Sequence, residues 1–97
     1  MRVKFHPEAR FDLREGKAFY RSRSPLAAAA FLHEIDTAIS RIRESPHRYP
    51  EGEYGTRELI LPWRFPFTVV YRTSEGLIVI VAVAHQSKEP AYWRHRT

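Results

Sequence analysis

The sequence predicts an α+β domain in which a helical hairpin packs on one face of a mostly antiparallel four-stranded sheet. Two observations lead to this fold class. The first half of the chain has the 3.6-residue apolar spacing of amphipathic helices, and the second half has short apolar or alternating runs bounded by glycine and proline. The expected order is β-α-α-β-β-β, followed by a short C-terminal segment. With 97 residues and a hydrophobic fraction of 43%, the chain has room for one domain, residues 1–97, and one core.

The N-terminal residues predict a strand and a helix. Residues 2–6 alternate in polarity, and Pro7 stands where a helix begins, since proline is favoured at the first helical position. Glycine costs about 1 kcal/mol relative to alanine inside a helix, so Gly16 on the apolar stripe indicates that another helix approaches closely there. The stripe consists of Ala9, Leu13, Gly16 and Tyr20.

A second helix is predicted to begin at Ser24-Pro25, with the serine as N-cap, and to end before Pro46. Only residues 21–24 join the two helices, so an antiparallel hairpin is expected. The apolar face of the second helix would consist of Ala27, Phe31, Ile35, Ala38 and Ile42.

The second half of the chain predicts three strands and a tail. A loop over residues 47–56 precedes the strands, a turn at residues 74–76 joins the last two, and Pro90 would open one helical turn in the tail. The predicted strands are residues 57–61, 67–73 and 77–84.

The last predicted strand is apolar on both faces. A strand in a sheet that is covered on one side only would alternate. The second face is therefore covered, either by the C-terminal segment with Tyr92 and Trp93 or by a partner chain. Strict alternation would place Leu77, Val79, Val81 and Val83 on one face, and Ile78, Ile80, Ala82 and Ala84 on the other.

Composition narrows the possible functions. The absence of cysteine excludes disulfide scaffolds, thiolate metal sites and cysteine nucleophiles. The histidines have no short ligand spacing and there is no glycine-rich phosphate loop, so we expect neither a metal nor another cofactor. The formal charge is +5, and 13 of the 16 cationic side chains are arginine. Arginine binds carboxylates and phosphates through two parallel hydrogen bonds. This balance indicates an anionic partner, either a nucleic acid or an acidic protein.

Neither a signal peptide nor a membrane helix is predicted. Residues 1–6 are too short and too charged for a signal peptide. The longest apolar run, residues 77–84, is far shorter than the roughly 20 residues that a membrane helix needs. We therefore expect a soluble, cytoplasmic protein that does not associate with a membrane.

Three phrases of the sequence carry a family resemblance. They are residues 45–50 (SPHRYP), residues 64–72 (RFPFTVVYR), and residues 82–85 (AVAH) followed by residues 90–96 (PAYWRHR). In this order and spacing they resemble the RelE/ParE superfamily of bacterial toxins from type II toxin–antitoxin systems, to which plasmid-stabilisation proteins are also similar. The resemblance runs over almost the whole chain. It implies a toxin that is silenced by a cognate antitoxin, whose C-terminal segment wraps around it.

The superfamily that this chain resembles uses one fold for two activities. RelE-like members are metal-free ribonucleases that cut messenger RNA in the ribosomal A site, and ParE-like members are non-enzymatic inhibitors of DNA gyrase. The nuclease branch usually has arginines where this chain has Thr68 and Gln86, and each lost cation costs about 2–4 kcal/mol of transition-state stabilisation. We therefore expect a ParE-like gyrase inhibitor or a divergent toxin. The alternatives are a ribosome-dependent ribonuclease and an inactive relic that only binds its antitoxin.

Candidate site residues follow from these activities. If the chain is a ribonuclease, His85 and Tyr92 are the candidate catalytic residues, since histidine exchanges protons near neutral pH and tyrosine can stack on a base or donate a proton. Phe11 and Phe19 lie off the apolar stripe of the first helix and are candidates for binding the antitoxin, whose toxin-binding part should be acidic. Candidate cations for binding nucleic acid or another target are Arg57, Arg64, Arg72, Lys88, Arg94 and Arg96.

Overall fold

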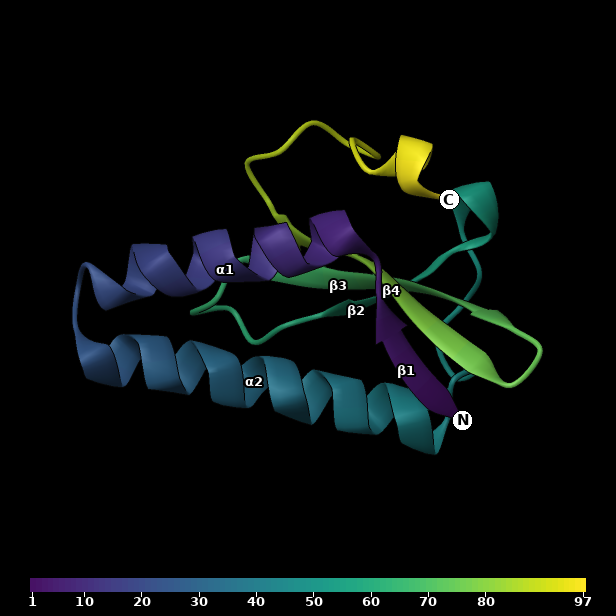
Figure 1. Ribbon diagram of the computed structural model, residues 1–97, viewed down its shortest axis with the longest axis horizontal. Coiled ribbons are helices and arrows are strands. Elements are labelled where there is room, and N and C mark those ends of the chain that lie inside the picture. The colour runs from purple at the N-terminus through teal and green to yellow at the C-terminus, as the bar shows by residue number, and fades with distance from the viewer.

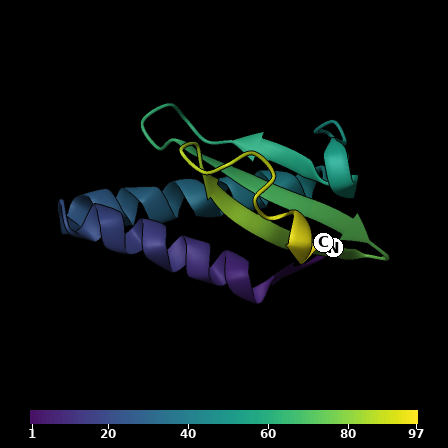
Figure 2. The same ribbon diagram turned by 90° about the horizontal axis from the view of Figure 1, so that it is seen from above.

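The computed structural model describes residues 1–97 and confirms the predicted order of elements (Figure 1). The turn between the two helices lies at one end of the molecule and the turn between the last two strands at the other (Figures 1 and 2). No helix has the length and apolar character needed to span a membrane. The elements are β1 (Arg2–Phe5), α1 (Pro7–Arg21), α2 (Pro25–Glu44), the 3₁₀ turn η1 (Glu53–Gly55), β2 (Arg57–Ile60), β3 (Phe67–Ser74), β4 (Leu77–His85) and the 3₁₀ turn η2 (Arg94–Arg96).

The four strands form one mixed sheet in the order β1-β4-β3-β2. β3 pairs antiparallel with both β2 and β4. β1 pairs parallel with β4, with Arg2 opposite Leu77 and Phe5 opposite Ile80. A parallel pair needs a long crossover, which all the elements from α1 to β3 supply here. The sheet is therefore mostly antiparallel, as predicted, and its parallel pairing lies at one edge.

Both long helices begin with a side-chain cap and a proline in the first turn. The Ser24 hydroxyl accepts a hydrogen bond from the Ala27 N–H at 3.0 Å, which confirms the predicted N-cap. Nδ1 of His6 accepts one from the Glu8 N–H at 3.1 Å. These bonds satisfy N–H groups that no carbonyl of the same helix can reach, so each helix start is fixed locally by the sequence.

The helical hairpin covers one face of the sheet with a contiguous apolar core. A Cβ atom added to Gly16 would lie 2.8 Å from Cζ of Phe31 in α2. The missing side chain thus makes room for the Phe31 ring, which confirms the close approach predicted there. Buried members of this core are Ala9, Phe31, Ile35, Ala38 and Ile42 from the helices, and Leu59, Phe67, Val69, Tyr71, Ile78, Ile80 and Val83 from the strands.

A β-bulge changes which side chains of β4 face the helices. The register of β3 on β4 shifts between Val70 and Tyr71, and Val81 is left as an extra residue. An extra residue reverses the alternation beyond it. Val83 therefore joins the helix-facing core, and Ala82 joins the cluster on the opposite face. The grouping predicted from strict alternation is wrong beyond Val81.

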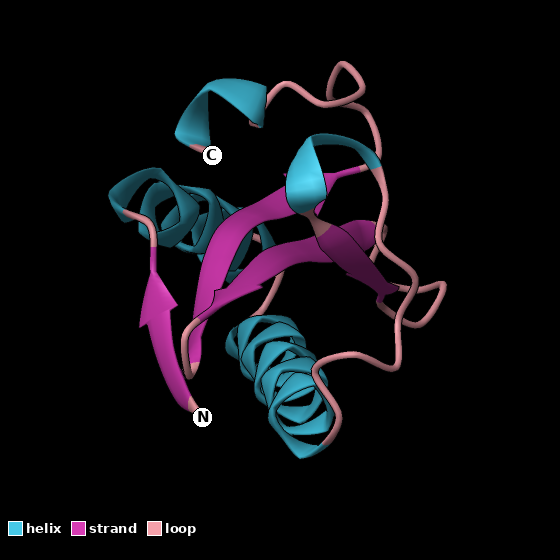
Figure 3. Cartoon of the chain, turned by 90° about the vertical axis from the view of Figure 1, so that its right-hand side faces the viewer, coloured by secondary structure: helices cyan, strands magenta, loops and turns pink.

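The C-terminal tail covers the second face of the sheet, which confirms the first of the two covers predicted. The tail lies on the side of the molecule opposite α2 (Figures 1 and 3). The helical turn predicted from Pro90 begins later, at Arg94, because Ala91 has a φ of +55°, which no right-handed helix contains. Trp93 is only 5% exposed and packs with Val70, Val79, Val81 and Ala82.

Candidate functional site

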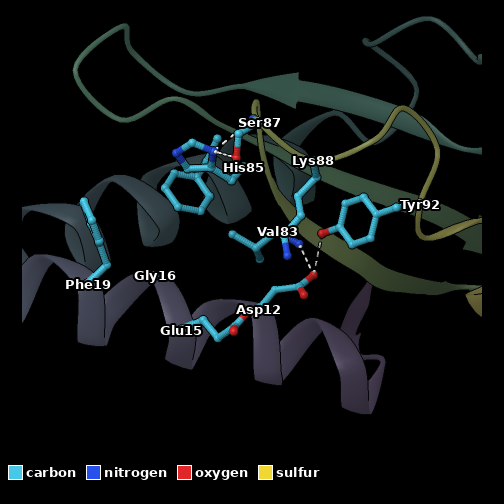
Figure 4. A pocket seen from close by; sticks show the side chains of 10 residues that line it. Asp12, Glu15, Gly16, Phe19, Val83, His85, Ser87, Lys88 and Tyr92 are labelled. Atoms are coloured by element: carbon cyan, nitrogen blue, oxygen red, sulfur yellow. Dashed lines mark hydrogen bonds between the residues drawn. The ribbon is translucent and has the colours of Figure 1, made fainter.

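A buried ion pair fastens the tail to α1. Asp12 is 7% exposed, and its Oδ2 accepts a hydrogen bond from Nη1 of Arg96 at 2.7 Å, while Oδ1 accepts one from Nη2 at 3.3 Å. The same Oδ2 accepts from the Tyr92 hydroxyl and from the Val83 N–H, both at 3.1 Å. Figure 4 shows the carboxylate with these last two donors above it. One side chain of α1 thus holds β4 and the tail together.

Arg96 lies inside the protein. Besides Asp12, its Nη1 binds the Val81 carbonyl at 3.1 Å, and its guanidinium lies 5.1 Å from the centre of the Tyr92 ring. Burial alone would lower the pKa of Arg96, but the hydrogen bonds and the charge of Asp12 outweigh it and raise the pKa. Because both Nη atoms are bonded within the chain, the guanidinium cannot bind an external phosphate or carboxylate through a pair of hydrogen bonds. Arg96 therefore belongs to the internal scaffold of the tail and is not part of an exposed cationic surface.

Tyr92 is half-buried beside the same ion pair. Burial, and then the negative charge and hydrogen bond of Asp12, raise the pKa of Tyr92 far above its ordinary value of 10.0. Its hydroxyl donates to Asp12, and the Lys88 ammonium lies 5.8 Å from the centre of its ring. A phenol that holds its proton so firmly is a poor proton donor to a leaving group at neutral pH.

A cavity of about 310 Å³ separates α1 from the end of β4 and the segment that follows it (Figure 4). In it, Nδ1 of His85 accepts a hydrogen bond from the Ser87 N–H at 2.9 Å, and the ring packs edge-on against Phe67 with centroids 4.9 Å apart. An acceptor Nδ1 places the hydrogen of a neutral imidazole on Nε2, so Nδ1 is engaged within the chain in this arrangement. The lining residues of the cavity include Asp12, Glu15, Phe19, Val83, Lys88 and Tyr92.

A second hollow, of about 300 Å³, lies against the outer face of the sheet. It brings together His85, Lys88 and Tyr92 with Thr68 and Gln86, the two positions at which the nuclease branch usually has arginine. Lys88 is the only lysine or arginine that lines it. Three carboxylates line it as well, those of Glu53, Glu58 and Glu89. Acidic side chains therefore outnumber the permanent cation at this place.

The other candidate cations are scattered and do not form one site. Arg57 is half-buried, donates to the carbonyls of His47 and Tyr49, and lies 3.6 Å from a Glu51 carboxylate oxygen, so it braces the loop before β2. Arg64 lies 3.8 Å from a carboxylate oxygen of Glu34 on α2.

Two candidate cations remain on β3 and in the tail. Arg72, on β3, has a buried Nε without a hydrogen-bond partner. Arg94, in η2, is exposed and donates to the Ala91 carbonyl at 3.0 Å. The proposed roles of Arg57, Arg64, Arg72, Lys88 and Arg94 in target binding stay predictions.

The two candidate antitoxin contacts lie on α1. Phe11 is 52% exposed and Phe19 is 51% exposed. Phe19 also lines the cavity beside His85, and the guanidinium of Arg23 lies 4.7 Å from the centre of its ring. Both rings are therefore accessible to a partner, and Phe19 places an apolar surface next to a cation.

Comparison with known proteins agrees with this architecture. A helical hairpin over a four-stranded mixed sheet, closed by a C-terminal tail, is the fold expected of a RelE/ParE superfamily toxin. Residues 3–90 match the family model for the ParE toxin of the type II toxin–antitoxin system parDE, and the chain belongs to that family.

One similar solved structure is described as the chromosomal ParDE TA system from P. aeruginosa. It has a TM-score of 0.76 and 22% sequence identity, over 88% of this chain and 95% of that one. At this identity the similarity shows a shared fold. No curated protein matches the sequence.

Sequence reasoning missed Asp12 and the three glutamates of the second hollow. A signal for Asp12 was present, because it falls three residues after Ala9 and four before Gly16, on the buried stripe of α1. A carboxylate on such a stripe needs a buried partner. Glu53, Glu58 and Glu89 carried no such signal, since the distant segments that hold them meet only in the folded chain.

Proposed function

We propose that this chain acts as a toxin by binding a protein target, DNA gyrase, and that it does not cut RNA. Its place in the ParE family supports the toxin role, and ParE-like members of the superfamily are non-enzymatic inhibitors of gyrase. The acidic lining of the second hollow is the observation that favours gyrase over messenger RNA as the target. That hollow holds the positions where the nuclease branch concentrates its cations, and here they are Thr68 and Gln86 beside three carboxylates.

The electrostatics of the hollow oppose RNA cleavage. A phosphate entering it would meet Glu53, Glu58 and Glu89, with Lys88 as its only permanent cation. Cleavage adds negative charge at the phosphorus, so the transition state would be repelled more strongly than the substrate. The Tyr92 hydroxyl is engaged by Asp12, and Nδ1 of His85 by Ser87. The groups for proton transfer are thus occupied as well.

A supercoiling assay tests this proposal. Purified toxin, added to DNA gyrase and relaxed plasmid, should inhibit supercoiling at micromolar concentration. The variant His85→Ala should inhibit as well as the wild type, because the proposal gives His85 no part in the chemistry. No inhibition by correctly folded wild-type toxin at these concentrations would count decisively against gyrase as the target.

A ribosome-dependent ribonuclease is the second candidate, and one observation favours it. His85, Lys88 and Tyr92 line both the cavity and the second hollow, so a potential acid, base and cation lie around one segment. Primer extension on messenger RNA after induction would reveal new cuts in the ribosomal A site. If such cuts occur and disappear in His85→Ala and Tyr92→Phe, the ribonuclease is correct and the gyrase proposal is wrong.

We also propose that an antitoxin with an acidic toxin-binding segment covers α1. The exposed rings of Phe11 and Phe19 support this, together with the formal charge of +5. Apolar anchors would supply affinity, and surrounding charges would speed the encounter. Co-expression with the product of the adjacent small open reading frame should yield a stable complex, and Phe11→Ser with Phe19→Ser should weaken it at least tenfold. An unchanged affinity would place the antitoxin elsewhere.

A further inference from the structure

The connection between β2 and β3 exposes a tryptophan that the fold does not use. Trp63 is 92% exposed, whereas the other tryptophan of the chain, Trp93, is 5% exposed. A tryptophan ring is normally buried in large part, since it offers more apolar area than almost any other side chain. No contact within the chain therefore explains the presence of an indole at position 63.

The turn that carries Trp63 is held firmly at its base. The Phe65 N–H donates to the Pro62 carbonyl at 2.9 Å, and the Leu61 N–H donates to the Phe67 carbonyl at 3.0 Å. The Phe65 ring is 5% exposed and packs against Tyr20 and Phe31, with centroids 5.2 and 5.8 Å away. Trp63 and Arg64 thus stand at the corner of a preorganised turn, which would lose little backbone freedom on binding.

Two arginines and one carboxylate, that of Glu34, lie beside the turn, which leaves a net positive charge for an acidic partner. The neighbouring Arg64 side chain is 59% exposed, and its guanidinium lies 5.2 Å from the centre of the Phe65 ring and 3.8 Å from Glu34. A further arginine, Arg41, lines a shallow hollow that begins at Pro62. Tryptophan and arginine are the side chains most enriched among residues that dominate protein interfaces. An adjacent pair on a rigid turn is suited to an apolar pocket with a carboxylate at its rim.

The turn and the surface proposed for the antitoxin are carried by different elements, although the base of the turn contacts α1 where Phe65 packs on Tyr20. Phe11 and Phe19 belong to α1, whereas the turn of residues 62–65 is joined by Arg64 to Glu34 of α2. The β2–β3 connection points toward the end of the molecule where the two helices are joined, and the helices extend beyond it (Figures 1 and 2). The chain thus has exposed apolar side chains on two different elements. A short antitoxin segment bound to α1 would use those of α1, and Trp63 would remain for another partner.

We propose that the toxin binds its protein target through the turn of residues 62–65. The Trp63 indole enters an apolar pocket on an acidic face of the target, and Arg64 pairs with a carboxylate beside that pocket. The inference rests on the proposed function in one respect, namely that the target is a protein.

The experiment compares Trp63→Ala with Leu26→Ala, a matched control because Leu26 is also a large apolar side chain and is 82% exposed. Both variants should melt within about 2 °C of the wild type, since neither side chain is buried. Trp63→Ala should raise the concentration for half-inhibition of gyrase supercoiling at least tenfold and relieve growth arrest after induction. It should bind the antitoxin as the wild type does. Leu26→Ala should match the wild type in all assays, and Arg64→Ala should show a smaller loss than Trp63→Ala.

Each outcome of this experiment decides the inference. Wild-type toxicity in Trp63→Ala overturns it, and so does a tenfold loss of antitoxin binding, because the turn would then belong to the antitoxin surface. If the wild type arrests growth but leaves gyrase unaffected, the gyrase proposal fails by itself. Relief of arrest by Trp63→Ala, with no cuts in messenger RNA, would then still support the turn as the contact to another protein. A wild type that neither arrests growth nor inhibits gyrase overturns both proposals.

Discussion

The two faces of the sheet are covered by different means. On one face, two helices bury a contiguous cluster of 14 side chains. On the other, a cluster of five buried side chains depends on the Trp93 indole, and the tail that carries Trp93 is fastened by the carboxylate of Asp12. Apolar area stabilises the first face, and a few polar contacts hold the cover of the second. The tail is therefore the part expected to open while the rest of the domain stays folded.

The largest expected effect tests the helix face. Phe31→Ala removes a fully buried ring and should lower the free energy of unfolding by about 3–5 kcal/mol. Trp93→Ala removes a larger side chain but should cost only about 2 kcal/mol, because the tail can move away instead of leaving a cavity. Urea denaturation measures both. An equal or larger loss for Trp93→Ala would show that the two faces are equally integral to the fold.

The next effect tests the fastening of the tail. Asp12→Ala removes the buried partner of the Arg96 guanidinium, which should cost about 2 kcal/mol, less than the usual cost of breaking a buried pair because the tail can open and return Arg96 to water. The loss should be local, so trypsin should cleave after Lys88 and Arg94 much faster than in the wild type. A double variant, Asp12→Leu with Arg96→Leu, removes both charges and should regain much of the lost stability. Unchanged cleavage in Asp12→Ala would mean that the indole alone holds the tail.

A smaller effect tests the packing between the helices. Gly16→Ala favours the helix by about 1 kcal/mol, but the new Cβ would lie 2.8 Å from Phe31, and overpacking costs about 1–3 kcal/mol. The net loss should be about 1 kcal/mol. Denaturation of Gly16→Ala beside Ala18→Gly, an exposed position on the same helix, separates the two contributions. A stabilised Gly16→Ala would show that the Phe31 ring can shift freely.

The smallest expected effect is the dependence of stability on pH that Tyr92 causes, and it is absent at neutral pH. Because the pKa of Tyr92 is raised in the folded protein, the unfolded chain loses this proton first as the pH rises above 10. The contribution of Tyr92 to the free energy of unfolding is therefore fully present below pH 10. It is lost above pH 10, by at most about 1.4 kcal/mol per pH unit for this one group. Tyr92→Phe should flatten the decline in stability with rising pH. Equal slopes for wild type and Tyr92→Phe would contradict the raised pKa.

The fold was predictable where local signals agree with the long-range structure. Proline marks both helix starts, a serine precedes it at the second, and Gly16 marks the close helix contact. The faces of β4 were not predictable beyond Val81, because residues 82–84 are all apolar and the bulge leaves no trace in a uniform run. The start of η2 was missed because the positive φ of Ala91 is imposed by the docking of the tail and not by its own side chain.

The site was less predictable than the fold, for a physical reason. Trp63 is exposed and Trp93 is buried, yet the two residues are the same amino acid in the sequence. Arg96 and Arg94 are likewise the same side chain two positions apart, but Asp12 takes one of them into the interior. The partner that decides the second difference lies 84 residues away in the chain, and only the folded structure brings it close.

The parallel pairing of β1 with β4 has a consequence for synthesis. β1 has its only neighbour in β4, which is synthesised after β2 and β3, and Asp12 pairs with a residue 84 positions later. A nascent chain therefore cannot close its sheet until β4 has been synthesised, since the β1–β4 pairing joins residues that are far apart in the sequence. Chains cut short by a stalled ribosome would present unpaired edges and an open core to cellular proteases. Only chains that include β4 and the tail can therefore acquire the native shape.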